Sequence, residues 1–175
     1  HKKTLASIIT GFEKIRWNRY FFAFALWGTL IILLTVGSYL YSPEDMEIHF
    51  NFSKFIILLI VAVIFVPIQT ATEELIFRGY LFQGFGNLFK NGLAPLIITS
   101  ILFGLMHGTN PEAKAHGLLI MLPYYIFFAL FLGILTLLDE GLELAMGIHC
   151  ANNLVSSLLI TSKNSVLQTD AIFST

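Results

Sequence analysis

The sequence predicts an all-α fold, a polytopic transmembrane helical bundle of about five apolar segments in a single membrane domain, residues 1–175. Composition is the first reason: 56% of the residues are hydrophobic and 12% are charged, whereas soluble domains carry about 25% charged residues. The mean hydropathy is +0.78. Several apolar runs also approach the ~20 residues that a helix needs to cross a bilayer, and they lack the alternation of barrel strands.

Charge and cysteine content exclude other classes of site. The net charge of −1 gives no basic surface for nucleic acid, so we expect no nucleic-acid partner. The single cysteine, Cys150, excludes an intramolecular disulfide and a metal cage built from cysteines alone.

Residues 1–19 mix basic side chains with apolar ones at roughly helical spacing. This pattern predicts an amphipathic helix on the membrane surface, and the alternative is a basic segment without defined structure. The apolar run Tyr20–Tyr41 predicts the first span, and an acidic loop follows it. The positive-inside rule therefore predicts a cytoplasmic N-terminus in a bacterial cytoplasmic membrane. The basic residues are Lys2, Lys3, Lys14, Arg16 and Arg19, and the acidic ones are Glu44, Asp45 and Glu47.

The second apolar pattern covers Phe55–Phe85 and contains Pro67. Proline disturbs helical hydrogen bonding, so the pattern predicts one long, bent helix or two abutting halves. Gly86 and Gly92 mark the turn that follows. The third segment, Leu93–Met106, is helical by the same criteria but short for a complete span.

The last two segments follow a predicted helix start. Asn110 before Pro111 is typical of a helix N-terminus, and the helix is expected to lead into the fourth segment, Gly117–Leu138. The fifth segment covers Leu142–Ile160. The polar tail from Thr161 is expected to be frayed.

Polar side chains inside these apolar segments are the candidate functional residues, because charge at membrane depth is costly unless it is paired or hydrated. Glu74 and Arg78 are four residues apart, about 40° around a helix, and can form an ion pair. Glu73 lies about 140° from Arg78 and is left as the free carboxylate. The alternative is that all three face a water-filled groove and neutralise one another. The remaining candidates are His107, His149, Asn152 and Asn153.

The histidines and asparagines add a second group. His149 and Asn153 share one face of the fifth segment, and His107 ends the third. Together with Glu73 they suit activation of a water and stabilisation of an oxyanion. Glu73, His107 and His149 are also a familiar zinc set, although without the compact HExxH spacing such a site would combine three helices. Asn152 is a weaker candidate, expected to cap, pack or hydrogen-bond between helices.

Three motifs in this order resemble those of one family. The stretch "EELIFRG" (Glu73–Gly79) matches EExxxR, "FGLMHGTNP" (Phe103–Pro111) matches FxxxH, and "HCANN" (His149–Asn153) matches HxxxN. The chain resembles the CPBP family, which includes CAAX prenyl endopeptidases of the Ras-converting type and the bacteriocin-processing or immunity-associated Abi proteins of bacteria. The resemblance covers roughly residues 55–161, which would be the catalytic core.

The resemblance implies an intramembrane endopeptidase, a hydrolase that cuts a peptide or membrane-anchored protein at the lipid bilayer. Glu73 and His107 resemble the family's water-activating pair, and His149 and Asn153 the pair of its oxyanion hole. A mechanism without a cofactor is favoured. Zn²⁺ held by Glu73, His107 and His149 is the alternative. The supporting positions of the first motif are Glu74 and Arg78.

The expected substrate follows from a departure from the prenyl-processing members of the family. Prenyl-processing members have additional spans before the first motif, and bacterial relatives generally have no prenylated proteins to cut. Peptide pheromones, bacteriocin precursors or membrane-anchored regulators are therefore the expected substrates. One alternative is an immunity or scaffolding protein that binds without proteolysis. A transporter or proton relay is a weaker alternative, because the motif order favours a protease and no inverted repeat is visible.

Overall fold

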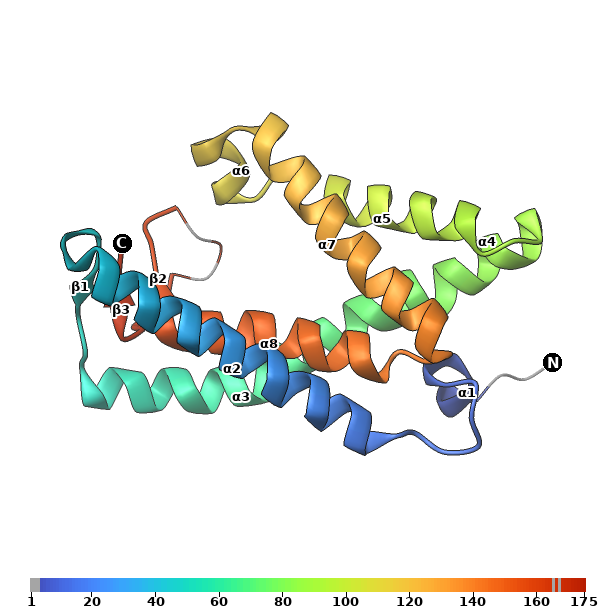
Figure 1. Ribbon diagram of the computed structural model, residues 1–175, viewed down its shortest axis with the longest axis horizontal. Coiled ribbons are helices and arrows are strands. Elements are labelled where there is room, and N and C mark those ends of the chain that lie inside the picture. The colour runs from blue at the N-terminus through green and yellow to red at the C-terminus, as the bar shows by residue number, and fades with distance from the viewer. Residues whose placement is uncertain (1–3, 165, 167) are drawn as a thin grey trace.

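The computed structural model describes residues 4–164, 166 and 168–175, and in them the chain forms a helical bundle with one small sheet (Figure 1). The predicted all-α class is confirmed, because each of the five predicted apolar segments is helical. Their cores are α2 (Trp17–Tyr41), α3 (Phe52–Glu74), α5 (Leu93–His107), α7 (Leu118–Asp139) and α8 (Glu143–Leu159).

The second apolar segment is one continuous helix rather than two abutting halves. Helix α3 contains Pro67 and leads directly into a π-helical segment, η2 (Leu75–Leu81), and then α4 (Phe82–Phe89). In η2 the N–H of Phe82 bonds to the carbonyl of Phe77, five residues earlier. Such π segments inside α-helices are often found at functional sites, and this one contains Arg78 of the first motif.

Among the described residues, three helices are long and apolar enough to cross a membrane: Trp17–Tyr41, Phe52–Phe89 and Leu118–Asp139. Helix α5 is apolar but has only 15 residues. The outward faces of α2 and α3 expose many large apolar side chains, which in a bilayer contact lipid rather than water. The chain is therefore an integral membrane protein.

Helix α8 lies at the centre of the bundle, against α2, α3 and α7 (Figure 1). Small residues permit this packing, as they do between membrane helices generally. A Cβ atom on Gly147 would collide with the backbone carbonyl of Tyr20 and would lie 3.1 Å from the Cβ of Ala23. The close approach of α2 and α8 holds the polar residues of α8 in the interior.

Replacing Gly147 by Ala is expected to destabilise the protein by about 1–3 kcal/mol, the usual cost of overpacking a tight interface. Gly37→Ala on α2 is the matched control, because a Cβ at Gly37 meets nothing within 4 Å. Thermal unfolding of both variants in detergent measures the difference. Equal midpoints for the two variants would contradict the close α2–α8 contact.

The N-terminal segment differs from the predicted surface helix. Its helix, α1 (Leu5–Ile9), has only five residues, and Ile9 and Thr10 are buried. Thr10 forms a β-bridge with Gly141 in the α7–α8 turn, and Gly79 of η2 leaves room for the side chain of Ile8. The prediction was wrong because apolar residues at helical spacing can pack against the protein as well as against lipid. Lys2 and Lys3 lie outside the described residues.

An ion-pair network holds this segment in place. The Arg16 guanidinium lies 2.7 Å from Asp139 Oδ2 and 2.9 Å from Glu143 Oε2, and Arg19 lies 3.0 Å from Asp139 Oδ1. The hydrogen bond to Glu143 raises the pKa of Arg16, so the guanidinium stays charged. Two of the five basic residues of the N-terminal segment, Arg16 and Arg19, therefore contact protein carboxylates.

A short helix begins at Pro111, after α5, where the sequence predicts a helix start. Helix α6 (Pro111–His116) follows Asn110, whose backbone is extended but whose side chain makes no capping hydrogen bond. Gly117 then adopts φ +90°, a conformation that favours glycine. It separates α6 from α7, so the fourth apolar helix starts at Leu118, one residue later than predicted.

The end of the bundle away from α1 carries a small sheet, which the sequence does not predict. Its strands are β1 (Glu47–Ile48), which follows a 3₁₀ turn η1 (Pro43–Asp45), β2 (Ile160–Thr161) and β3 (Phe173–Ser174). The order is β1-β3-β2, with β3 antiparallel to β1 and parallel to β2. The tail expected to be frayed is therefore paired at β3. Strands of two residues are too short to show a periodic pattern.

Candidate active site

Glu74, near the end of α3, is completely buried and holds two partners at one oxygen. Arg78 Nη1 donates to Glu74 Oε1 at 2.9 Å, and His149 Nδ1 lies 2.7 Å from the same oxygen. Exposure of Glu74 is 0%. The predicted i, i+4 ion pair is confirmed, and the structure adds a contact to α8 that helical spacing could not reveal.

Arg78 makes two further contacts that fix its guanidinium. Its Nη2 donates to the carbonyl of Ala129 on α7 at 3.1 Å. The guanidinium also lies 4.6 Å from the centre of the Phe103 ring, a cation–π arrangement. Arg78 therefore joins η2, α5 and α7 around the buried Glu74 carboxylate.

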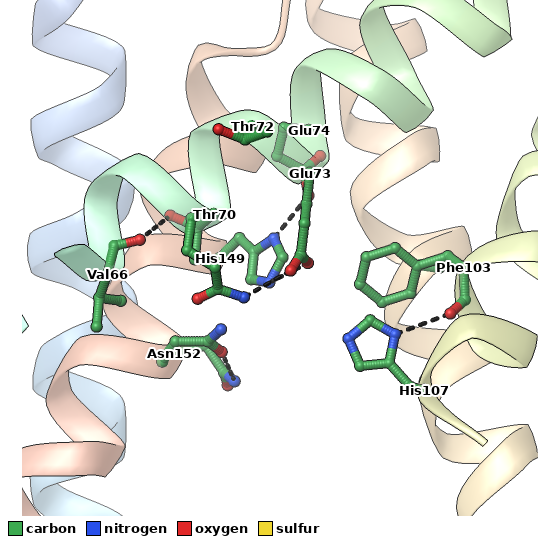
Figure 2. Close-up of polar contacts among 12 residues, drawn as sticks. Val66, Thr70, Thr72, Glu73, Glu74, Phe103, His107, His149 and Asn152 are labelled. Atoms are coloured by element: carbon green, nitrogen blue, oxygen red, sulfur yellow. Dashed lines mark hydrogen bonds and ion pairs between the residues drawn. The ribbon is translucent and has the colours of Figure 1, made fainter. Parts of the chain in front are cut away.

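Within the described residues, Arg78 pairs with Glu74 and no ion pair joins it to Glu73, as the helical positions predict. Gln69 Nε2 donates to Glu73 Oε1 at 2.6 Å. The other oxygen, Oε2, is buried without a hydrogen bond from the described residues and lies 3.7 Å from His149 Nε2. Figure 2 shows the Glu73 carboxylate beside the His149 ring. One carboxylate oxygen of Glu73 is thus left as an available acceptor.

The contact with Glu74 determines which ring nitrogen of His149 carries a proton. A carboxylate oxygen bonded by an arginine only accepts hydrogen bonds, so His149 Nδ1 is the donor in the 2.7 Å contact. In the neutral ring, Nε2 is then an acceptor. It becomes a donor only when the ring is an imidazolium. The ring is further enclosed by Phe103 and Phe128, with centroids 5.9 and 5.8 Å away.

His107 lies across the same space, at the end of α5 (Figure 2). Its Nδ1 lies 2.8 Å from the carbonyl of Phe103, which can only accept, so Nδ1 donates and Nε2 keeps its lone pair in the neutral ring. The ring stacks on Phe103 at 4.4 Å and lies 5.0 Å from Tyr125. These contacts orient a histidine whose free nitrogen can accept a proton or hydrogen bond.

Asn153 lies one turn beyond His149 and is held by its neighbour. Asn152 Nδ2 donates to Asn153 Oδ1 at 3.2 Å, and Trp27 Nε1 on α2 donates to Asn152 Oδ1 at 3.3 Å. Of the three roles open to Asn152 from the sequence, capping, packing or hydrogen bonding between helices, the structure shows a hydrogen bond between helices.

A pocket of about 810 Å³ connects these groups, within the usual range for ligand sites. His107, His149 and Asn153 line it, whereas Glu73 does not and instead contacts the lining residues Gln69 and His149. The pocket therefore collects three of the four predicted catalytic side chains, with the fourth beside it. Much of the remaining wall is apolar or aromatic, including Phe65, Val66, Phe103, Met121, Tyr124, Tyr125 and Phe128.

A metal does not fit the arrangement of these side chains. Within residues 4–164, 166 and 168–175, no three His, Cys, Asp or Glu side chains converge as a ligand set. His107 and His149 each engage Nδ1 in a hydrogen bond, and a metal would need their Nε2 atoms to meet at one point with a carboxylate. The zinc alternative is not assembled in this structure, and no chemical step below uses a metal.

Comparison with known proteins decides the family. A family described as "Type II CAAX prenyl endopeptidase Rce1-like" matches residues 52–155, more than half of the chain. The chain belongs to this family. The family predicted from the three motifs is confirmed, because all of them lie inside the matched range.

A relative of this Rce1-like chain is the uncharacterized protein YyaK of Bacillus subtilis (strain 168). The two are 38% identical over 166 residues, which is 94% of this chain and 55% of YyaK. The chain thus spans about half the length of that relative. No solved structure matched.

Three residues of this Rce1-like site were not predicted from the sequence. Gln69 contacts Glu73 and precedes it by four residues, so helical spacing carried a signal for it. Trp27 reaches Asn152 from α2, 125 positions away in the chain, and no local pattern indicates that contact. Tyr125, next to His107, sits in an uninterrupted apolar run where one aromatic residue does not stand out.

Proposed function

We propose that this Rce1-like protein is an intramembrane endopeptidase that hydrolyses a peptide bond in a membrane-associated protein or peptide. One observation carries the proposal: the two adjacent carboxylates have different partners, although each keeps its Oε2 without a hydrogen bond from the described residues. Glu74 is fully buried and its Oε1 is bonded to Arg78 and His149. Glu73 is partly exposed, its Oε1 is bonded to the neutral Gln69, and its Oε2 lies 3.7 Å from His149 Nε2. A free carboxylate beside histidines and a pocket suits general base catalysis.

In the first step Glu73 accepts a proton from a water molecule that also donates to Nε2 of His107. The water oxygen attacks the carbonyl carbon of the substrate, and the C–O bond forms as the carbonyl becomes an oxyanion. The tetrahedral intermediate then collapses, the C–N bond breaks, and the leaving nitrogen takes the proton that Glu73 acquired. The products are a carboxylic acid, which ionises, and an amine, so the residues return to their starting state.

Asn153 and His149 would stabilise the oxyanion. A preorganised donor of this kind contributes about 3–4 kcal/mol to the transition state. Asn153 can donate through its amide nitrogen. His149 can donate to the oxyanion through Nε2 only as an imidazolium, because its Nδ1–H already donates a hydrogen bond to Glu74. The position of Glu74, and of Arg78 behind it, keeps the His149 ring in one orientation.

The function is tested with purified protein in detergent, a peptide library, and mass spectrometry of the products. We expect cleavage at a discrete peptide bond, unchanged by EDTA or 1,10-phenanthroline, and no stoichiometric zinc in metal analysis. The reason is that the described histidines and carboxylates do not meet as ligands. One equivalent of zinc with chelator-sensitive cleavage would replace this mechanism by the zinc alternative. No cleavage of any membrane-associated peptide would contradict the endopeptidase itself.

A second candidate is an immunity or scaffolding protein that binds a peptide without cutting it. The observation in its favour is that Glu73 does not line the pocket, whereas apolar and aromatic side chains do. Such a pocket suits an apolar peptide. The two candidates are distinguished by a Glu73 variant in cells, as described in the Discussion.

We further propose that the protein lies in a bacterial cytoplasmic membrane with its N-terminus in the cytoplasm. Lys14 and Arg16 precede the first span and Arg19 lies in its first turn, and the positive-inside rule counts such residues even when carboxylates lie nearby. Labelling of a cysteine placed at the exposed Phe12 with a membrane-impermeant reagent tests the orientation. Labelling of this cysteine in intact cells would place the N-terminus outside the cell and contradict the proposed orientation.

A further inference from the structure

We infer that Trp27 and Asn152 are positioning residues that commit the side-chain amide of Asn153 to act as a donor in the pocket. The inference rests on the proposed function, in which Asn153 stabilises an oxyanion. Its physical basis is a chain of two hydrogen bonds, from Trp27 Nε1 to Asn152 Oδ1 at 3.3 Å and from Asn152 Nδ2 to Asn153 Oδ1 at 3.2 Å.

The two hydrogen bonds have a fixed direction because the first donor, the indole N–H of Trp27, cannot accept. An indole N–H has no acceptor atom, so the atom of Asn152 that faces it must be the carbonyl oxygen. The amide nitrogen of Asn152 then faces Asn153, and the atom of Asn153 that it meets must again be an oxygen. The amide nitrogen of Asn153 is left without a hydrogen-bond partner in the described part of the chain. It is this donor that remains available to the pocket that Asn153 lines.

Without these two hydrogen bonds the side-chain amide of Asn153 has no determined orientation. Its oxygen and nitrogen have similar size, so a rotation of 180° would exchange them with little steric cost. The rotated form would present a carbonyl oxygen to a developing oxyanion and would repel it. Trp27 therefore determines that Asn153 presents its amide N–H, and not its carbonyl oxygen, to the pocket. Trp27 itself does not line the pocket.

Trp27 is rigidly held, as a positioning residue must be. Its ring stacks on Phe131 of α7 with centroids 5.7 Å apart, and it packs against the buried cluster of Ala23, Leu132, Ala145 and Ile148. Helix α2 lies outside residues 52–155 that match the family. The first span thus has a role in the chemistry as well as in anchoring the bundle.

The physical link is measured independently of catalysis, by the side-chain amide resonances of protein labelled with ¹⁵N in detergent. The Asn153 signal is assigned by its loss in Asn153→Ala. Trp27→Phe keeps an aromatic ring near Phe131 and removes the indole N–H together with part of the ring volume. We expect it to move the Asn153 amide signal, whereas Trp17→Phe, a change at an exposed tryptophan, leaves it in place. An Asn153 signal that is identical in Trp27→Phe and wild type would overturn the inference.

The kinetic consequence is a fall in kcat with KM unchanged, because the oxyanion exists only in the transition state. We expect Trp27→Phe to lower kcat about two- to tenfold, the size of one net hydrogen bond. In an Asn153→Ala background the same change should have no further effect. An equal effect in both backgrounds would show a merely structural role for Trp27. If the Asn153 signal moves but wild-type protein cleaves no peptide, the positioning stands and the proposed function fails.

Discussion

Replacing Glu73 by Gln is expected to lower kcat for peptide hydrolysis by about 10²- to 10⁴-fold, the usual contribution of a general base. Gln has the same shape and can still bond to Gln69, but it cannot take a proton from water. Because Glu73 is bonded to the neutral Gln69 and forms no ion pair with an arginine in the described part of the chain, the neutral side chain should leave the fold intact. Steady-state kinetics with the best library peptide gives kcat, and thermal unfolding gives stability.

Glu44→Gln is the control for this change, since Glu44 is an exposed acid in the loop after the first span. It should leave both kcat and the unfolding midpoint unchanged. Full activity of Glu73→Gln would remove Glu73 from the mechanism. In cells, the same variant separates catalysis from binding: an immunity phenotype that survives Glu73→Gln would favour the binding candidate.

Local periodicity was sufficient for the helices and for the ion pair of the first motif. Apolar runs give the helices because every backbone group must be bonded within its own segment at membrane depth. The spacing of Glu74 and Arg78 gives their pairing because residues four apart are neighbours on any helix. Gln69 could have been found by the same spacing. These are properties of one segment considered alone.

Contacts between segments were not available from local pattern. His149 is hydrogen-bonded to Glu74, 75 positions away in the chain. Arg16 is hydrogen-bonded to Asp139 and Glu143, which are 123 and 127 positions away. The same is true of Trp27 and Asn152. A helical wheel shows which face a residue is on but not which helix lies opposite. For that reason the pairing of Glu74 rather than Glu73 with Arg78 could be predicted from the sequence, whereas the contact of Glu74 with His149 could not.

Breaking the Glu74–Arg78 pair is expected to destabilise the protein by about 3–5 kcal/mol, because either single substitution leaves an uncompensated charge in the interior. Arg78→Leu leaves the completely buried Glu74 without its guanidinium, and Glu74→Leu leaves Arg78 without its carboxylate. Both variants should show strongly lowered unfolding midpoints in detergent. Arg78→Leu with an unchanged midpoint would contradict a charged, buried pair.

The double variant Glu74→Leu/Arg78→Leu separates stability from catalysis. Replacing both partners of a buried pair by apolar residues is often neutral or stabilising, so its unfolding midpoint should recover most of the loss seen in the single variants. Its kcat should not recover, because His149 Nδ1 no longer has the acceptor that fixes its proton and its ring orientation. Wild-type kcat in a stable double variant would show that Glu74 serves only the charge balance of Arg78. Recovered stability without recovered kcat would instead assign Glu74 a second role, as the residue that sets the protonated nitrogen of His149.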